Sequence, residues 1–128
     1  MVSAERKVLL VEDSVTGAQH MSRTIEGLGG FSIVGRAMNG LEAIRLYREL
    51  QPDLVVMDIV MPDMDGITAL RTILAQDKNA YVVMVSSMGG VGEKANECLR
   101  LGAKSVVSKP FDIDNLRKAL GAGAAHGG

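Results

Sequence analysis

Four of the five short apolar runs in the sequence end in side chains that carry a charge or a hydroxyl group. These residues are Glu12 and Asp13, Asp58, Ser86 and Ser87, and Lys109. Three carboxylates brought to one place would repel one another, and a divalent cation or a lysine would relieve that repulsion. Mg2+ suits such a cluster because it prefers oxygen ligands. Cationic groups and a hydroxyl around a carboxylate describe a phosphoryl-transfer site in which an aspartate can be the nucleophile.

The elements that must position these residues are five predicted strands. They are Lys7–Val11, Phe31–Ala37, Asp53–Asp58, Tyr81–Ser86 and Ser105–Ser108. The first, third and fourth are almost continuously apolar, as is typical of parallel strands buried on both faces. The second is mixed and the fifth is short, so we expect both near the edges of the sheet. Only the second ends without an obvious chemical group.

Between the strands, apolar residues recur at steps of three and four, which predicts five helices. Met21, Ile25 and Leu28 mark the first, and Asn39 and Asp65 are suitable caps for the starts of the second and third. Alternating strands and helices predict an α/β fold with a doubly wound parallel sheet. Such sheets bind ligands at the carboxyl ends of their strands, where the reactive residues lie.

The composition limits the other classes of function. The 128 residues carry a net charge of −1, which argues against sequence-independent binding of nucleic acid. Cys98 is the single cysteine, so no internal disulfide can form. No run approaches the roughly 18 apolar residues of a membrane span. We therefore expect a cytoplasmic protein without membrane insertion, with one domain over residues 1–120 and a flexible tail or linker stub over 121–128.

Four stretches of the sequence resemble the signature motifs of CheY-like receiver domains of two-component response regulators. They are VLLVEDS, MDIVMPDMDG, VMVSSM and GAKSVVSKPF, and the resemblance covers residues 7 to 120. It implies a flavodoxin-like (βα)5 fold with strand order 2-1-3-4-5. It also implies a signalling switch rather than an enzyme, of the kind that acts in chemotaxis.

The resemblance assigns roles to individual residues. Asp58 matches the phosphoacceptor, and Asp13 matches the direct ligand of Mg2+, for which Mn2+ is a possible substitute. Glu12 matches the neighbour that holds a metal-bound water. The backbone carbonyl of Val60 is the expected ligand two residues after the acceptor. Lys109 matches the lysine that pairs with the phosphoryl group, and its bond to the following proline is expected to be cis.

The remaining expected roles concern switching. Ser86 matches the hydroxyl residue that reaches the phosphoryl group. Val106 stands where the family carries an aromatic switch residue, so the output could come instead from the loop that begins with Ser87 and Met88. Val60 and Met88 are apolar where the family flanks the attacking water, so we expect slow self-dephosphorylation. A polar replacement at either position that left the decay rate unchanged would contradict this.

The implied partners are a sensor histidine kinase and a downstream target protein, with a phosphorylation-dependent dimer as an option. Two rivals remain. An aspartyl-phosphate phosphatase of the haloacid-dehalogenase type would need a second aspartate where Val60 stands. A pseudo-receiver would bind protein without being phosphorylated, against which the intact Asp13, Asp58 and Lys109 argue.

Overall fold

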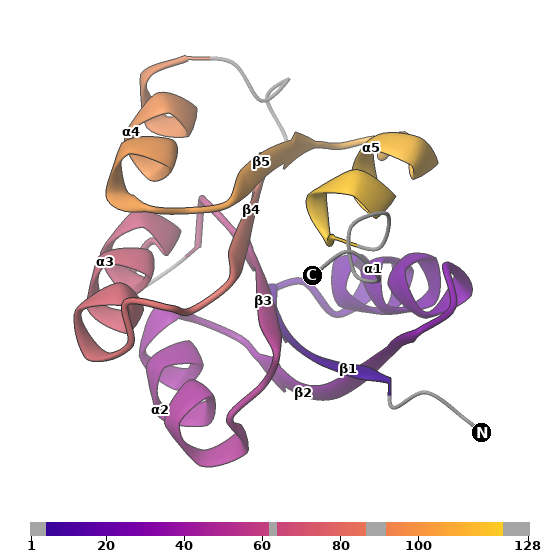
Figure 1. Ribbon diagram of the computed structural model, residues 1–128, viewed down its shortest axis with the longest axis horizontal. Helices are drawn as coiled ribbons and strands as arrows, with labels where there is room; N and C mark the ends of the chain where they lie inside the picture. The colour runs from indigo at the N-terminus through magenta and orange to yellow at the C-terminus, as the bar shows by residue number, and fades with distance from the viewer. Residues whose placement is uncertain (1–4, 62–63, 87–91, 122–128) are drawn as a thin grey trace.

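A five-stranded parallel sheet forms the centre of the computed structural model, which describes residues 5–61, 64–86 and 92–121 (Figure 1). The strand order is β2-β1-β3-β4-β5, as predicted. The strands are β1 (Arg6–Val11), β2 (Phe31–Ala37), β3 (Leu54–Asp58), β4 (Val82–Ser86) and β5 (Ser105–Ser108). The helices are α1 (Val15–Gly27), α2 (Gly40–Leu50), α3 (Gly66–Gln76), α4 (Glu93–Leu101) and α5 (Ile113–Ala119).

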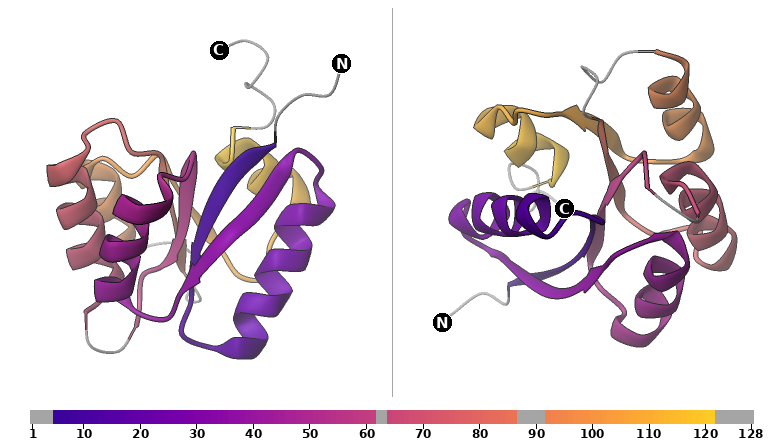
Figure 2. Two further views of the ribbon diagram at one scale, coloured as in Figure 1. Left: turned by 90° about the horizontal axis from the view of Figure 1, so that it is seen from below. Right: turned by 180° about the vertical axis from the view of Figure 1, so that it is seen from behind.

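Helices cover both faces of the sheet and divide the core in two. Helices α2, α3 and α4 lie on one face, and α1 and α5 lie on the other (Figures 1 and 2). Successive residues of β3 alternate between the two cores: Val55 packs beneath the first group of helices and Val56 beneath the second. All five residues of β3 are buried, because the strand is covered on both faces. This confirms the interpretation of the continuously apolar runs.

The predicted boundaries were correct to within one residue. The strand β1 begins one residue earlier than predicted, at Arg6, whereas β3 and β4 begin one residue later. Asp53 is outside β3, although its carboxylate accepts a hydrogen bond of 2.7 Å from the backbone of Lys7. The mixed second run and the short fifth run are the two edge strands, as predicted.

The caps fix where the helices begin, and therefore how the loops beside the site are held. Asn39 and Asp65 cap α2 and α3 as predicted, with side-chain oxygens 2.9 and 2.8 Å from the backbone nitrogens of Glu42 and Thr68. Ser14 caps α1 by accepting from the Gly17 nitrogen at 3.1 Å. These bonds satisfy backbone donors that have no partner within the helix. Within the described residues, no helix is long and apolar enough to span a membrane.

Candidate functional site

Three carboxylates meet at the carboxyl edge of the sheet. Glu12 and Asp13 directly follow β1, and Asp58 ends β3, which is hydrogen-bonded to β1. One oxygen from each lies within 4.8 Å of the others. Glu12 and Asp58 are only 2% and 8% exposed, whereas Asp13 is exposed. Two buried carboxylates and one open carboxylate form a set of hard oxygen ligands with access from solvent, which suits Mg2+.

Lys109 brings a positive charge to this cluster from the far edge of the sheet. Its Nζ lies 3.0 Å from Glu12 Oε1 and 3.6 Å from Asp58 Oδ2. The lysine therefore donates a hydrogen bond to Glu12 and forms a longer ion pair with Asp58. Its peptide bond to Pro110 is cis, as expected. The arrangement leaves Asp58 as the less neutralised of the two buried carboxylates.

The pKa values of the two buried carboxylates move in opposite directions. Burial raises the pKa of Asp58 to about 6, and the nearby charge of Glu12 adds to this more than Lys109 offsets it. Burial also acts on Glu12, but the hydrogen bonds from Lys109 and from the Ser14 backbone nitrogen hold its pKa below the usual value. The pKa of Lys109 is raised: burial opposes this, but the hydrogen bond to Glu12 and the charge of Asp58 outweigh it.

Asp58→Asn is expected to stabilise the metal-free protein at neutral pH. Because the pKa of Asp58 rises from 3.8 to about 6 on folding, the folded state favours the protonated acid. That favourable contribution is complete below pH 4 and is lost as the pH rises through 6. At pH 7.5 with a chelator, the free energy of unfolding of the variant should be about 2 kcal/mol higher than that of wild type. Urea unfolding at several pH values measures the difference.

The pH dependence separates this charge effect from a general effect of the substitution. The gain should shrink toward zero at pH 4, where wild-type Asp58 is also neutral. Glu5→Gln removes an exposed carboxylate from the start of the chain and should change stability by less than about 0.5 kcal/mol throughout. A gain for Asp58→Asn that is equal at pH 4 and pH 7.5 would contradict the assigned pKa.

The other predicted site residues are placed around this cluster. Ser86 ends β4 and is paired with Ser108 of β5, and its backbone carbonyl oxygen accepts a hydrogen bond of 2.9 Å from the backbone N–H of Lys109. Val60 follows Asp58 by two residues and is 63% exposed. Val106 in β5 packs against the core beneath α2, α3 and α4. Ser87 and Met88 lie outside the described residues, so the predictions that concern them stay predictions.

Sequence reasoning missed Arg36. The second predicted strand shows no chemical group at its end in the sequence pattern, yet Arg36 precedes its last residue and reaches the backbone of the site. Its Nη2 lies 3.1 Å from the Glu12 carbonyl oxygen and 3.3 Å from that of Asp13. A lone arginine in an otherwise uncharged strand, next to its carboxyl end, was the available signal.

Comparisons with known proteins identify the family of the chain. Residues 8–121 match the family model described as the response regulator receiver domain. The chain is 41% identical to the chemotaxis protein CheY of Listeria monocytogenes over 114 residues, which cover 89% of this chain and 94% of that protein. It is 40% identical to CheY of Bacillus subtilis over 89% of this chain and 93% of that protein.

A solved structure extends the similarity to three dimensions. The CheX–CheY–BeF3–Mg2+ complex of Borrelia burgdorferi contains a chain with a TM-score of 0.85 and 36% identity, covering 93% of this chain and 89% of that one. The chain belongs to the family of response regulator receiver domains and is of the CheY type.

Proposed function

We propose that this receiver domain accepts a phosphoryl group on Asp58 from the phosphohistidine of a sensor histidine kinase. The observation that carries the proposal is the position of the Asp58 carboxylate. It lies within 4.8 Å of two further carboxylates and 3.6 Å from Lys109 Nζ. Phosphoryl transfer depends mainly on positioning and charge neutralisation, and this cluster provides both.

The proposed step exchanges one bond to phosphorus for another. An oxygen of ionised Asp58 attacks the phosphorus, the phosphorus–nitrogen bond to histidine breaks, and the imidazole leaves with the bonding electrons. Asp13, Asp58 and the Val60 carbonyl would hold Mg2+, with Glu12 acting through a bound water. When bound, Mg2+ would neutralise charge on the phosphoryl oxygens. Lys109 stands next to the acceptor oxygen and can shift from Glu12 toward the arriving group.

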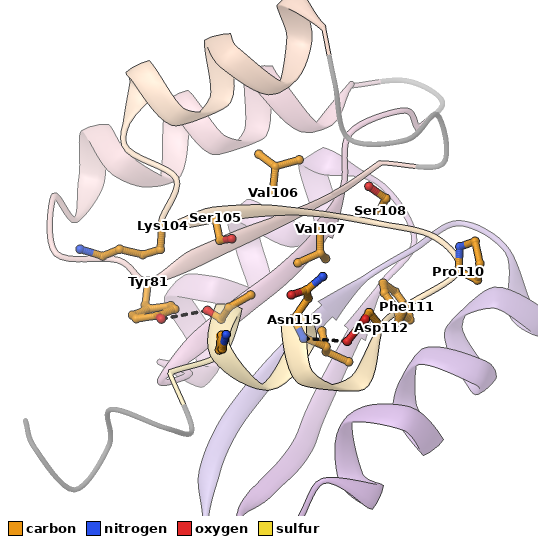
Figure 3. Close-up of a pocket in the computed structure, with 13 residues that line it drawn as sticks. Tyr81, Lys104, Ser105, Val106, Val107, Ser108, Pro110, Phe111, Asp112 and Asn115 are labelled. Atoms are coloured by element: carbon orange, nitrogen blue, oxygen red, sulfur yellow. Dashed lines mark hydrogen bonds between the residues drawn. The ribbon is translucent and has the colours of Figure 1, made fainter.

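The face formed by α4, β5 and α5 is the proposed output surface. A groove of about 460 Å³ runs between β5 and α5 and is shown in Figure 3. Val107 points toward α5, whereas Val106 points toward the opposite core, which includes α4 (Figure 3). Ser108 of the same strand is paired with Ser86 at the phosphorylation site. Strand β5 therefore connects the proposed output surface with the site around Asp58. Val106 stands in this strand where the family carries an aromatic switch residue, so an aromatic side chain cannot change position here.

Intact-mass spectrometry after incubation with acetyl phosphate tests the proposal. Wild type should gain one phosphoryl group in the presence of Mg2+ and none in its absence, and Asp58→Asn should gain none under either condition. Asp53→Asn is a matched control, because Asp53 precedes the same strand at its opposite end. A short series of incubation times guards against rapid loss of the group.

The possible outcomes distinguish a working receiver from a pseudo-receiver and from a phosphatase. A Mg2+-dependent adduct that requires Asp58 would support a working receiver. No adduct at any time would favour the pseudo-receiver, which binds protein without phosphorylation. An adduct that survives Asp58→Asn would refute the acceptor assignment. Steady release of inorganic phosphate from small phosphomonoesters would favour the phosphatase, although Val60 stands where that class needs an aspartate.

A further inference from the structure

Strand β2 contains an irregularity that decides which way Arg36 points. Val8 pairs with Ile33 and Leu9 pairs with Gly35, so one residue of β2, Val34, has no pairing partner in β1. Side chains alternate between faces along a regular strand, and an extra residue reverses the alternation beyond it. Without the bulge, Arg36 would lie on the face opposite to Ile33.

The bulge instead places Arg36 on the face covered by α1 and α5. Arg36 pairs with Leu10, whose side chain packs in the core beneath those helices. The next pair, Ala37 with Val11, belongs to the other core. Because paired residues of neighbouring strands share a face, Arg36 lies on the side where the chain leaves β1 and turns into α1.

Arg36 makes three hydrogen bonds at this turn, all to backbone carbonyl oxygens. Its Nε and Nη2 lie 3.3 and 3.1 Å from the carbonyl oxygen of Glu12, and Nη2 lies 3.3 Å from that of Asp13. The planar guanidinium group thus holds two successive peptide units in a fixed relation. Both residues are members of the carboxylate cluster, so Arg36 contacts the main chain of two of its three members.

The two carboxylates differ in how far they depend on this restraint. The Glu12 carboxylate is also held by Lys109 Nζ at 3.0 Å and by the Ser14 backbone nitrogen at 3.1 Å. The Asp13 carboxylate is exposed, and its place in the cluster follows from the backbone that carries it. A restraint on the Asp13 peptide unit therefore acts most on the open, solvent-facing ligand of the site.

We infer that Arg36 is a positioning residue for the metal ligands: from β2 it fixes the Glu12–Asp13 backbone and so raises the affinity of the cluster for a divalent cation. The inference rests on the proposed function, in which this cluster holds Mg2+. Residues that orient ligands commonly change metal affinity by about 10- to 100-fold when they are removed. The positive charge of Arg36 would by itself oppose cation binding, so the sign of the effect distinguishes positioning from electrostatics.

The test compares Mg2+ binding by wild type, Arg36→Met and Arg36→Lys. Titration calorimetry should give a dissociation constant about tenfold weaker for Arg36→Met. Arg36→Lys keeps the charge but loses the planar fork, so its affinity should fall by about threefold. The Mg2+ concentration for half-maximal labelling by acetyl phosphate should rise in parallel. The labelling rate at saturating Mg2+ should stay within about twofold of wild type, because Arg36 contacts no reacting atom.

Arg117→Met is the matched control. Arg117 also donates a guanidinium hydrogen bond to a backbone carbonyl, that of Leu28 at 3.3 Å, on the α1–α5 side and outside the carboxylate cluster. Its loss should leave Mg2+ affinity unchanged. If Arg36→Met does not fold, Arg36→Lys decides the question by itself.

Four results would overturn the inference. Unchanged Mg2+ binding in both Arg36 variants would show that the arginine only stabilises the fold. Tighter binding would show that it acts as a repelling charge. An equal loss of affinity in Arg117→Met would assign the effect to general destabilisation. If wild type binds no Mg2+, both the proposed function and this role of Arg36 are refuted. If wild type binds Mg2+ and the Arg36 variants bind it equally well, only the role of Arg36 is refuted.

Discussion

Lys109→Met is expected to slow phosphorylation of Asp58 by acetyl phosphate by about 100- to 1000-fold at saturating Mg2+. Removing one preorganised donor that stabilises charge in a transition state has an effect of this size. Lys109 is the cationic side chain found within 4.0 Å of Asp58 and Glu12 among the described residues. Methionine keeps the apolar stem and a similar length, so the substitution removes mainly the charge. Rates of labelling followed by intact mass measure the effect.

Lys104→Met is the control for this experiment. Lys104 precedes the same strand, β5, but lies at its opposite end, where its ammonium group sits 5.8 Å from the centre of the Tyr81 ring. Its replacement should change the labelling rate by less than about twofold, because it contacts no group at the site. A Lys109→Met rate within tenfold of wild type would contradict the role given to the lysine.

Gly66→Ala is expected to lower the free energy of unfolding by about 3 kcal/mol, at the upper end for an overpacked site. Gly66 begins α3 and donates its N–H to the Ile59 carbonyl at 2.8 Å. A methyl group at this position would overlap the carbonyl oxygen of Asp58 and lie 2.9 Å from the Ile59 Cα atom. Both obstacles are backbone, so relief requires a shift of α3 or of the chain that carries Asp58. Urea unfolding measures the loss.

Gly27→Ala is expected to have the opposite effect on the free energy of unfolding. Gly27 ends α1, and a methyl group there would meet no atom within 4 Å. Alanine should stabilise the protein by about 0.5 kcal/mol, because it restricts the unfolded chain. A loss for Gly66→Ala no larger than about 0.5 kcal/mol would show that α3 moves freely away from Asp58. The Mg2+-dependent labelling rate of Gly66→Ala then reports whether such a shift displaces the acceptor.

The sequence by itself determined the fold class, the two edge strands and the edge of the sheet that carries the site, and the family resemblance added the strand order. Continuous apolar runs can be stable strands only when both faces are covered, and alternating helices provide that cover. Because parallel strands all end at one edge, residues as distant in sequence as Glu12 and Lys109 were expected at the same edge of the sheet. The structure places their side chains 3.0 Å apart. The caps Asn39 and Asp65 were also predictable, because they depend on local hydrogen bonds.

Tertiary structure decided how the charges at that edge are distributed. The sequence identified Lys109 as a partner of the cluster, but only the packed structure shows that it hydrogen-bonds Glu12 and stands farther from Asp58. The pKa of Asp58, raised to about 6, follows from its burial in the packed structure and from the nearby charge of Glu12. No local pattern in the sequence encodes burial of this kind.

Arg36 illustrates the same limit in the backbone. Regular alternation along β2, counted from Ile33, would have placed Arg36 on the opposite face of the sheet. The bulge between the pairs Val8–Ile33 and Leu9–Gly35 reverses that placement. A bulge arises from the pairing of two strands, so it depends on contacts between segments distant in sequence. The sequence thus identified the charged and hydroxyl residues at the strand ends, and the pairing and packing of the strands decided which of them touch and brought Arg36 to the site.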